Sequence, residues 1–191
     1  LDAKQTCCRA EGILLVAELA LAAISEDVTA IGGLTVGADP VAYGVAAVAA
    51  TRGRELRSFT IRKEAKDHGV AGRLAGALVP GDKVVITEDA VTRGTSPMEA
   101  AEVVRALGAE PVLILPVVDR GGTCEDLAAA AGIPFHPLVT APDLGFGPWR
   151  NSSILASATG REVYPLERRI AFQEFGVPAG ARRLAPAGAG R

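Results

Sequence analysis

The stretch that decides the fold is KVVITEDAVTRGTS, which spans residues 83–96. Its apolar residues 84–86 predict a buried strand, and the adjacent acids Glu88 and Asp89 follow at the carboxyl end of that strand. A short polar loop comes next, and Pro97 is typical of the first turn of a helix, here an amphipathic one. Ligands of open α/β sheets bind outside the carboxyl ends of the strands, so the same stretch predicts a binding site.

The polar loop, residues 92–96, has the composition of an anion site. A loop of Gly, Ser and Thr that opens a helix offers free backbone N–H groups and the positive end of the helix dipole to a phosphate. The two carboxylates just before it would repel a triphosphate but suit hydroxyl groups or a metal ion. Acids and loop together predict a sugar with a phosphate attached as the ligand. The alternative is a capped helix start with ordinary charges at a strand end.

Strands and helices alternate along the rest of the chain. Apolar spacing predicts helices over residues 11–24, 40–50 and 123–131, strands over residues 28–31, 56–61, 112–118 and 134–139, and a glycine-rich loop over residues 67–76. Strands that alternate with helices of this length imply an α/β fold with a parallel sheet and right-handed crossovers.

Composition restricts the class of protein. The 191 residues suffice for one domain with a sizeable core, and because 49% are hydrophobic but only 4% aromatic, Ala, Val and Leu must build that core. A net charge of −2 gives no general attraction to nucleic acid or membrane, and neither is an expected partner. Three cysteines without metal-binding spacing favour reduced thiols. With no secretory leader or membrane span visible, we expect a cytoplasmic protein.

Three stretches resemble motifs of one enzyme family. EDAVTRGTS, residues 88–96, resembles the 5-phosphoribosyl 1-diphosphate (PRPP) motif of type I phosphoribosyltransferases. IRKEAKDHG, residues 61–69, resembles the mobile catalytic loop of orotate phosphoribosyltransferases, and GGLTVGADP, residues 32–40, resembles their diphosphate-binding loop. The resemblance covers about residues 1–147. It implies the type I phosphoribosyltransferase fold: a mainly parallel central sheet flanked by helices, with a mobile catalytic loop.

The implied reaction is the transfer of the phosphoribosyl group from PRPP to orotate, which gives orotidine 5'-phosphate and diphosphate on the route to UMP. The resemblance also implies a homodimer, and Mg2+ held mainly by PRPP and water rather than directly by protein side chains. Two alternatives are a phosphoribosyltransferase for another base and a non-catalytic PRPP-sensing regulator on the same fold. Such regulators tend to lose the cations of the catalytic loop, which this chain keeps.

By this resemblance, PRPP would bind along the whole motif after the predicted strand. Glu88 and Asp89 would be catalytic, holding the ribose 2- and 3-hydroxyls and stabilising positive charge on the ribose as diphosphate leaves. Residues 92–96, here called the phosphate loop, would hold the 5-phosphate. At Arg93 the family often has a small residue or threonine. The PRPP-binding residues implied by this motif are Glu88, Asp89, Ala90, Val91, Thr92, Arg93, Gly94, Thr95 and Ser96.

The catalytic loop, residues 61–69, carries a cluster of cations. The resemblance implies that Lys66 and His68 are catalytic and reach the diphosphate, and that some of these contacts come from the partner subunit of the dimer. The cations implied in PRPP binding are Arg62, Lys63, Lys66 and His68. The glycines after them would permit opening and closing. The alternative is a solvated charge run in which neighbouring acids pair with these cations.

The resemblance also implies a diphosphate-binding loop and an orotate-binding arginine. The diphosphate loop, residues 35–38, would bind the diphosphate through main-chain N–H groups; its residues are Thr35, Val36, Gly37 and Ala38. Arg120 follows a predicted buried strand and would hold the orotate carboxylate, with Thr92 as a second orotate contact. A surface arginine is the alternative reading of Arg120.

The two ends of the chain depart from the family. The chain begins with Leu1 and shows no counterpart of the N-terminal lysine and aromatic residues that help hold orotate, so we expect that a natural start is missing and that orotate binds weakly. Residues 149–191 contain seven Arg, no Lys and three Glu. We expect one domain over residues 1–148, followed by a poorly ordered Arg-rich extension.

Overall fold

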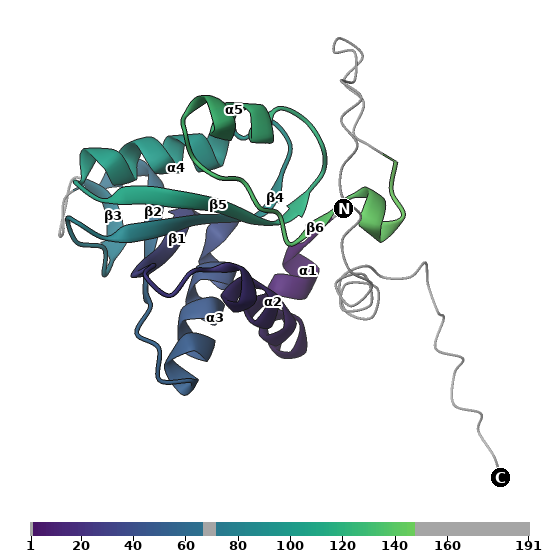
Figure 1. Cartoon of the computed structure of the whole chain (residues 1–191), viewed down its shortest axis with the longest axis horizontal. Helices are drawn as coiled ribbons and strands as arrows, with labels where there is room; N and C mark the ends of the chain where they lie inside the picture. The colour runs from purple at the N-terminus through teal and green to yellow at the C-terminus, as the bar shows by residue number, and fades with distance from the viewer. Residues whose placement is uncertain (1, 67–71, 148–191) are drawn as a thin grey trace.

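Six strands form one sheet with helices on both faces (Figure 1). The structure is a computed structural model that describes residues 2–66 and 72–147. Its strands are β1 (Ala30–Leu34), β2 (Arg57–Lys66), β3 (Gly72–Gly76), β4 (Lys83–Val91), β5 (Glu110–Asp119) and β6 (Val139–Thr140), in the order β3-β2-β1-β4-β5-β6. The pairs along β2-β1-β4-β5-β6 are parallel, and β3 is antiparallel to β2. The predicted α/β class with a mainly parallel sheet is confirmed.

The helices divide between the two faces of the sheet. They are α1 (Lys4–Cys7), α2 (Ala10–Ala23), α3 (Ala38–Thr51), α4 (Thr95–Ala106) and α5 (Cys124–Ala130), with a short 3-10 helix at Pro142–Leu144. The first three cover one face, and α4 and α5 cover the other (Figure 1). The predicted helices therefore form near their expected bounds, whereas α1 was not predicted. Within the described residues, no helix combines the length and apolar character needed to cross a membrane.

Successive residues of the central strands contribute their side chains alternately to two separate hydrophobic cores. On β4, Val85 joins the core beneath α2 and α3, whereas Val84 and Ile86 join the core beneath α4 and α5. Side chains of successive strand residues point to opposite faces, so a run of consecutive apolar residues is what a strand covered on both sides requires.

Strand β1 includes two glycines at which the prediction ended the strand. A Cβ placed on Gly32 would lie 2.4 Å from the Phe59 carbonyl oxygen, and one placed on Gly33 would lie 2.4 Å from the Thr87 carbonyl oxygen. The backbones on both sides approach so closely that only glycine fits. The expected end of this strand was wrong, because these glycines permit close strand packing rather than a turn.

The predicted glycine-rich loop over residues 67–76 was wrong in its second half. Gly72–Gly76 forms β3, which pairs with β2 in a hairpin. Leu74 of β3 lies opposite the buried Ile61 of β2 and packs against the core beneath α4. The buried Ile61 of β2 thus gives β3 an apolar partner.

The predicted strand over residues 134–139 was wrong in extent, since β6 covers only Val139–Thr140. The segment before β6 follows β5 with interrupted hydrogen bonding: Ile114 N–H donates to the Pro134 carbonyl oxygen at 2.8 Å. The N–H groups of His136 and Leu138 donate to the Ile114 and Pro116 carbonyl oxygens, each at 2.9 Å, but Pro116 of β5 has no N–H with which to continue the ladder.

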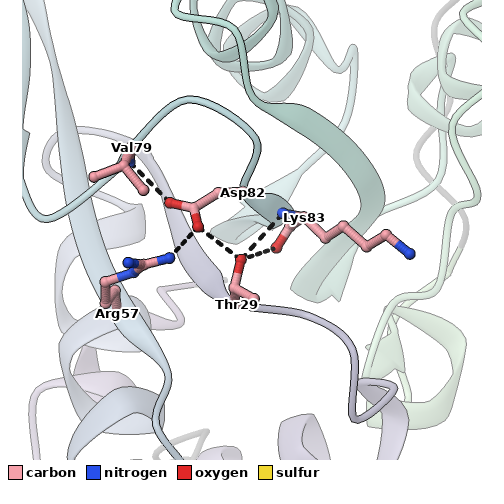
Figure 2. Close-up of polar contacts among 5 residues, drawn as sticks. All are labelled: Thr29, Arg57, Val79, Asp82 and Lys83. Atoms are coloured by element: carbon pink, nitrogen blue, oxygen red, sulfur yellow. Dashed lines mark hydrogen bonds and ion pairs between the residues drawn. The ribbon is translucent and has the colours of Figure 1, made fainter.

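A buried acid joins the amino-terminal ends of the strands, at the edge opposite the predicted site (Figure 2). Asp82 is 3% exposed, and its carboxylate accepts hydrogen bonds from Thr29 Oγ1 and the Val79 N–H, each at 2.8 Å. It also pairs with the guanidinium of Arg57. Thr29 Oγ1 accepts a further bond from the Lys83 N–H at 3.1 Å. This network connects β2 and β4 to the residue that precedes β1.

Candidate active site

The two predicted acids lie near the carboxyl end of β4 and are almost completely buried. Glu88 and Asp89 are 8% and 7% exposed. The diphosphate loop lies directly against them, because a Cβ placed on Gly37 would be 1.5 Å from Glu88 Oε1 and 2.5 Å from Asp89 Oδ1. Strands β1 and β4 are parallel neighbours, which brings the loop after β1 beside the acids.

Burial and the neighbouring carboxylate shift the ionisation of Glu88. Burial raises the pKa of the Glu88 carboxyl to about 8, and the adjacent Asp89 acts in the same direction. Removal from water penalises the charged form, and a second carboxylate nearby adds repulsion. The pair therefore favours a ligand that donates hydrogen bonds or carries positive charge to it.

The phosphate loop forms an open cavity of about 170 Å³. The cavity is lined by Glu88 and by residues 90–97, which places every residue of the PRPP-like motif except Asp89 on its wall. Helix α4 begins at Thr95, two residues before the predicted Pro97, and Gly94 precedes it with φ of +82°. The first N–H groups of a helix have no acceptor within the helix, so those of Thr95 and Ser96 are available to an anion.

The segment after β5 fixes the backbone of the phosphate loop. Arg120 N–H donates to the Val91 carbonyl oxygen at 2.9 Å, and Thr123 N–H donates to that of Thr92 at 3.0 Å. Thr123 Oγ1 donates to the Arg93 carbonyl oxygen, also at 3.0 Å. Sequence reasoning missed this role of Thr123. The bonds also bring the exposed Arg120 to the same edge as the loop, as expected from the parallel pairing of β4 and β5.

The diphosphate loop is fixed by a second acid. Helix α3 begins at Ala38, two residues before its predicted start at residue 40, and Asp39 lies in its first turn. Its carboxylate accepts hydrogen bonds from Thr35 Oγ1 at 2.7 Å and Thr60 Oγ1 at 2.8 Å. Thr60 lies on β2, so Asp39 connects the diphosphate loop to the strand that leads into the catalytic loop. Val36 is 63% exposed at the tip of the diphosphate loop.

The cations of the catalytic loop are only partly described. Arg62 and Lys63 lie on β2, where Arg62 is half-buried and Lys63 exposed. The Arg62 carbonyl oxygen accepts a bond from Arg73 Nε at 2.7 Å, which connects the start of β3 to the same strand. Lys66 is the last residue of β2, and its side chain, like all of His68, lies outside the described residues. The catalytic roles of Lys66 and His68 stay predictions.

The structure adds one cation that the sequence did not indicate. Lys4 Nζ lies 2.6 Å from Asp89 Oδ2. No motif contains Lys4, and 85 positions separate the two residues. In the described ranges, no group of three or more His, Cys, Asp or Glu side chains is arranged to hold a metal ion.

The chain is similar to known proteins in both sequence and structure. No family model matches the chain. It is 45% identical over 120 residues to the orotate phosphoribosyltransferase of Streptomyces avermitilis, covering 62% of this chain and 66% of that one, just under two thirds. It is 38% identical over 146 residues to that of Corynebacterium glutamicum, covering 76% of this chain and 78% of the relative. The structure of Mycobacterium tuberculosis orotate phosphoribosyltransferase in complex with PRPP matches with a TM-score of 0.66 at 30% identity, covering 76% of this chain and 82% of that one. The chain therefore has the type I phosphoribosyltransferase fold and belongs to the orotate phosphoribosyltransferase family.

Proposed function

We propose that this chain transfers the phosphoribosyl group from PRPP to orotate, giving orotidine 5'-phosphate and diphosphate for UMP biosynthesis. The observation that supports this most directly is the edge of the sheet where β4 ends. Two buried acids, the 170 Å³ cavity of the phosphate loop and the diphosphate loop meet there. These three parts correspond to the ribose, the 5-phosphate and the diphosphate of one substrate.

In this proposal the 5-phosphate binds the N–H groups at the start of α4. The ribose hydroxyls donate to Glu88 and Asp89. Positive charge that builds on the ribose favours the ionised form of Glu88, and the two carboxylates stabilise the transition state. Lys66 and His68 neutralise the departing diphosphate. Mg2+ bound with PRPP would add to that neutralisation, and the oxygens of the two acids suit its hydration shell.

Orotate is the nucleophile in this reaction. We place its carboxylate at Arg120, which can bind a carboxylate through two parallel N–H···O bonds, with Thr92 as a second contact. Its ring nitrogen attacks the anomeric carbon as diphosphate leaves, so no protein nucleophile is required. Positioning and electrostatic stabilisation provide the rate enhancement.

We further propose a two-fold homodimer in which Lys66 and His68 act in the partner subunit's site. The position of Lys66 as the last residue of β2, which pairs with the edge strand β3, supports this. Sedimentation of the chain at assay concentration tests the dimer, and a monomer with full turnover would contradict it.

The assay that tests the function follows PRPP consumption with Mg2+, with and without orotate. We expect consumption that depends on orotate and that adenine or hypoxanthine cannot replace. Consumption supported by a purine base would indicate a phosphoribosyltransferase for that base. PRPP binding without turnover with any base would indicate a non-catalytic regulator.

Gly37→Ala tests the contact between the diphosphate loop and the acids. The added methyl group would overlap Glu88 Oε1 and crowd Asp89 Oδ1, so both carboxylates must move. We expect kcat/KM for PRPP to fall by about a hundredfold, the scale for misplacing catalytic groups by about 1 Å. Folding should survive, because Gly37 has φ of −65°, which alanine adopts readily.

The control for this substitution is Gly147→Ala, since a Cβ there meets nothing within 4 Å. It should leave kcat/KM unchanged. Normal PRPP kinetics in Gly37→Ala would show that the acids need not occupy the positions described here.

A further inference from the structure

The first helix brings a positive charge to the acids of the active site. Lys4 is the first residue of α1, and its Nζ is 2.6 Å from Asp89 Oδ2. The side chain of Asp89 is 9% exposed and that of Lys4 is 46% exposed, so the ammonium group reaches from the surface to a buried carboxylate. The hydrogen bond to Asp89 raises the pKa of Lys4. The ammonium group therefore stays protonated near neutral pH.

The backbone that carries Lys4 is anchored on both sides. Ala3 and Cys7 are 3% and 2% exposed, and both belong to the core beneath α2 and α3. Helix α2 also approaches α1 closely, because a Cβ placed on Gly12 would lie 2.3 Å from the Thr6 carbonyl oxygen. The position of Lys4 is thus set by buried packing rather than by its ion pair alone.

The ion pair orients the Asp89 carboxylate. Oxygen Oδ2 faces Lys4, whereas Oδ1 faces the diphosphate loop at Gly37. An Asp side chain rotates easily about its terminal bond. A charge-assisted hydrogen bond to one oxygen restricts that rotation and leaves the other oxygen toward the ligand.

We propose that Lys4 is a positioning residue of the active site, whose ammonium group holds the Asp89 carboxylate in the orientation that accepts a ribose hydroxyl of PRPP. This rests on the proposed function, because it takes PRPP as the ligand at Asp89. Lys4 touches neither the ribose nor the reacting atoms in this assignment and acts through Asp89.

The test is a matched pair of substitutions, Lys4→Met and Lys83→Met. Lys83 pairs with Asp27 at 2.7 Å, and its side chain is also 46% exposed, so the same change breaks a similar ion pair at the amino-terminal end of β4. For Lys4→Met, we expect the Kd of PRPP with Mg2+, measured by calorimetry, and the KM for PRPP each to rise about tenfold, the scale of one hydrogen bond to a charged group. The KM for orotate should change little. Lys83→Met should change none of these constants.

Lys4→Arg should restore PRPP affinity to within about threefold of the unmodified chain, because guanidinium also donates to a carboxylate. If Lys4→Met does not fold, Lys4→Gln gives the same comparison with an uncharged donor. Unchanged PRPP affinity in the folded uncharged variant, an equal rise in both KM values, or failure of Lys4→Arg to restore PRPP affinity would overturn the proposal. Absence of orotate-dependent turnover in the unmodified chain would instead contradict the proposed function, while the calorimetric comparison would still test Lys4.

Discussion

Asp89→Asn is expected to lower the turnover number by about a hundred- to a thousandfold, which corresponds to losing about 2.7–4 kcal/mol of transition-state stabilisation. The substitution keeps the shape of the side chain but removes the negative charge closest to Lys4. In the proposed mechanism that charge stabilises the cationic ribose. The measurement is kcat for orotate-dependent PRPP consumption at saturating substrates.

The thermal midpoint of Asp89→Asn should remain close to that of the unmodified chain. Asp89 lies at the open edge of the sheet and outside both hydrophobic cores. Lys4, at 46% exposure, regains water when its partner loses charge. An exposed ammonium group contributes little to stability through one ion pair. A large fall in midpoint with turnover intact would show that Asp89 is a structural residue and reject the catalytic assignment.

The edge of the sheet that carries the proposed active site could be predicted from the sequence, because its signals are local. An apolar run, two adjacent acids and a Gly/Ser/Thr loop before a helix occupy fourteen consecutive residues, 83–96. Parallel strands place their carboxyl ends at one edge, so Gly37 and Arg120 could also be expected near the acids. The structure brings these segments together in that way.

The parts that could not be predicted depend on contacts between distant residues. Strand β3 is stabilised by the contact of Leu74 with Ile61 across the hairpin. Its own sequence, read without that partner, indicates a glycine-rich loop. Lys4 meets Asp89 only because α1 packs against the core, and a short helix of four residues has little signal of its own. Thr123 contacts the phosphate loop through backbone carbonyl oxygens, which any loop sequence provides.

The buried acids at the two edges of the sheet differ in how well their charge is compensated. At the carboxyl edge, burial raises the pKa of Glu88, so ionising that group costs stability in the free protein. At the amino-terminal edge, Asp82 is matched by three donors. An unfavourable buried acid at the proposed active site, with stability supplied by residues elsewhere, is typical of enzymes.

Asp82→Ala is therefore expected to lower the free energy of unfolding by about 3 kcal/mol, near the low end for removing one partner of a buried ion pair. The Val79 N–H, Thr29 Oγ1 and the Arg57 guanidinium would all lose their acceptor (Figure 2). The Arg57 side chain is 32% exposed, which lets water replace part of the loss. Its Nε is buried and has no hydrogen-bond partner within the described residues, so this guanidinium has little else to compensate it. Urea unfolding followed by circular dichroism measures this change, because the free energy of unfolding is calculated from the midpoint and slope of the transition.

The matched control is Asp27→Ala, which removes the exposed partner of Lys83 near the same edge. It should leave the urea midpoint close to that of the unmodified chain, because an exposed ion pair is screened by water and salt. At temperatures where Asp82→Ala remains folded, its turnover number should match that of the unmodified chain, since Asp82 lies at the other end of β4 from the acids. The two substitutions thus distinguish the roles of the two edges. Asp82→Ala is expected to lower stability and leave turnover unchanged, whereas Asp89→Asn is expected to lower turnover and leave stability nearly unchanged. Equal urea midpoints for Asp82→Ala and Asp27→Ala would mean that the buried network does not hold the strands together.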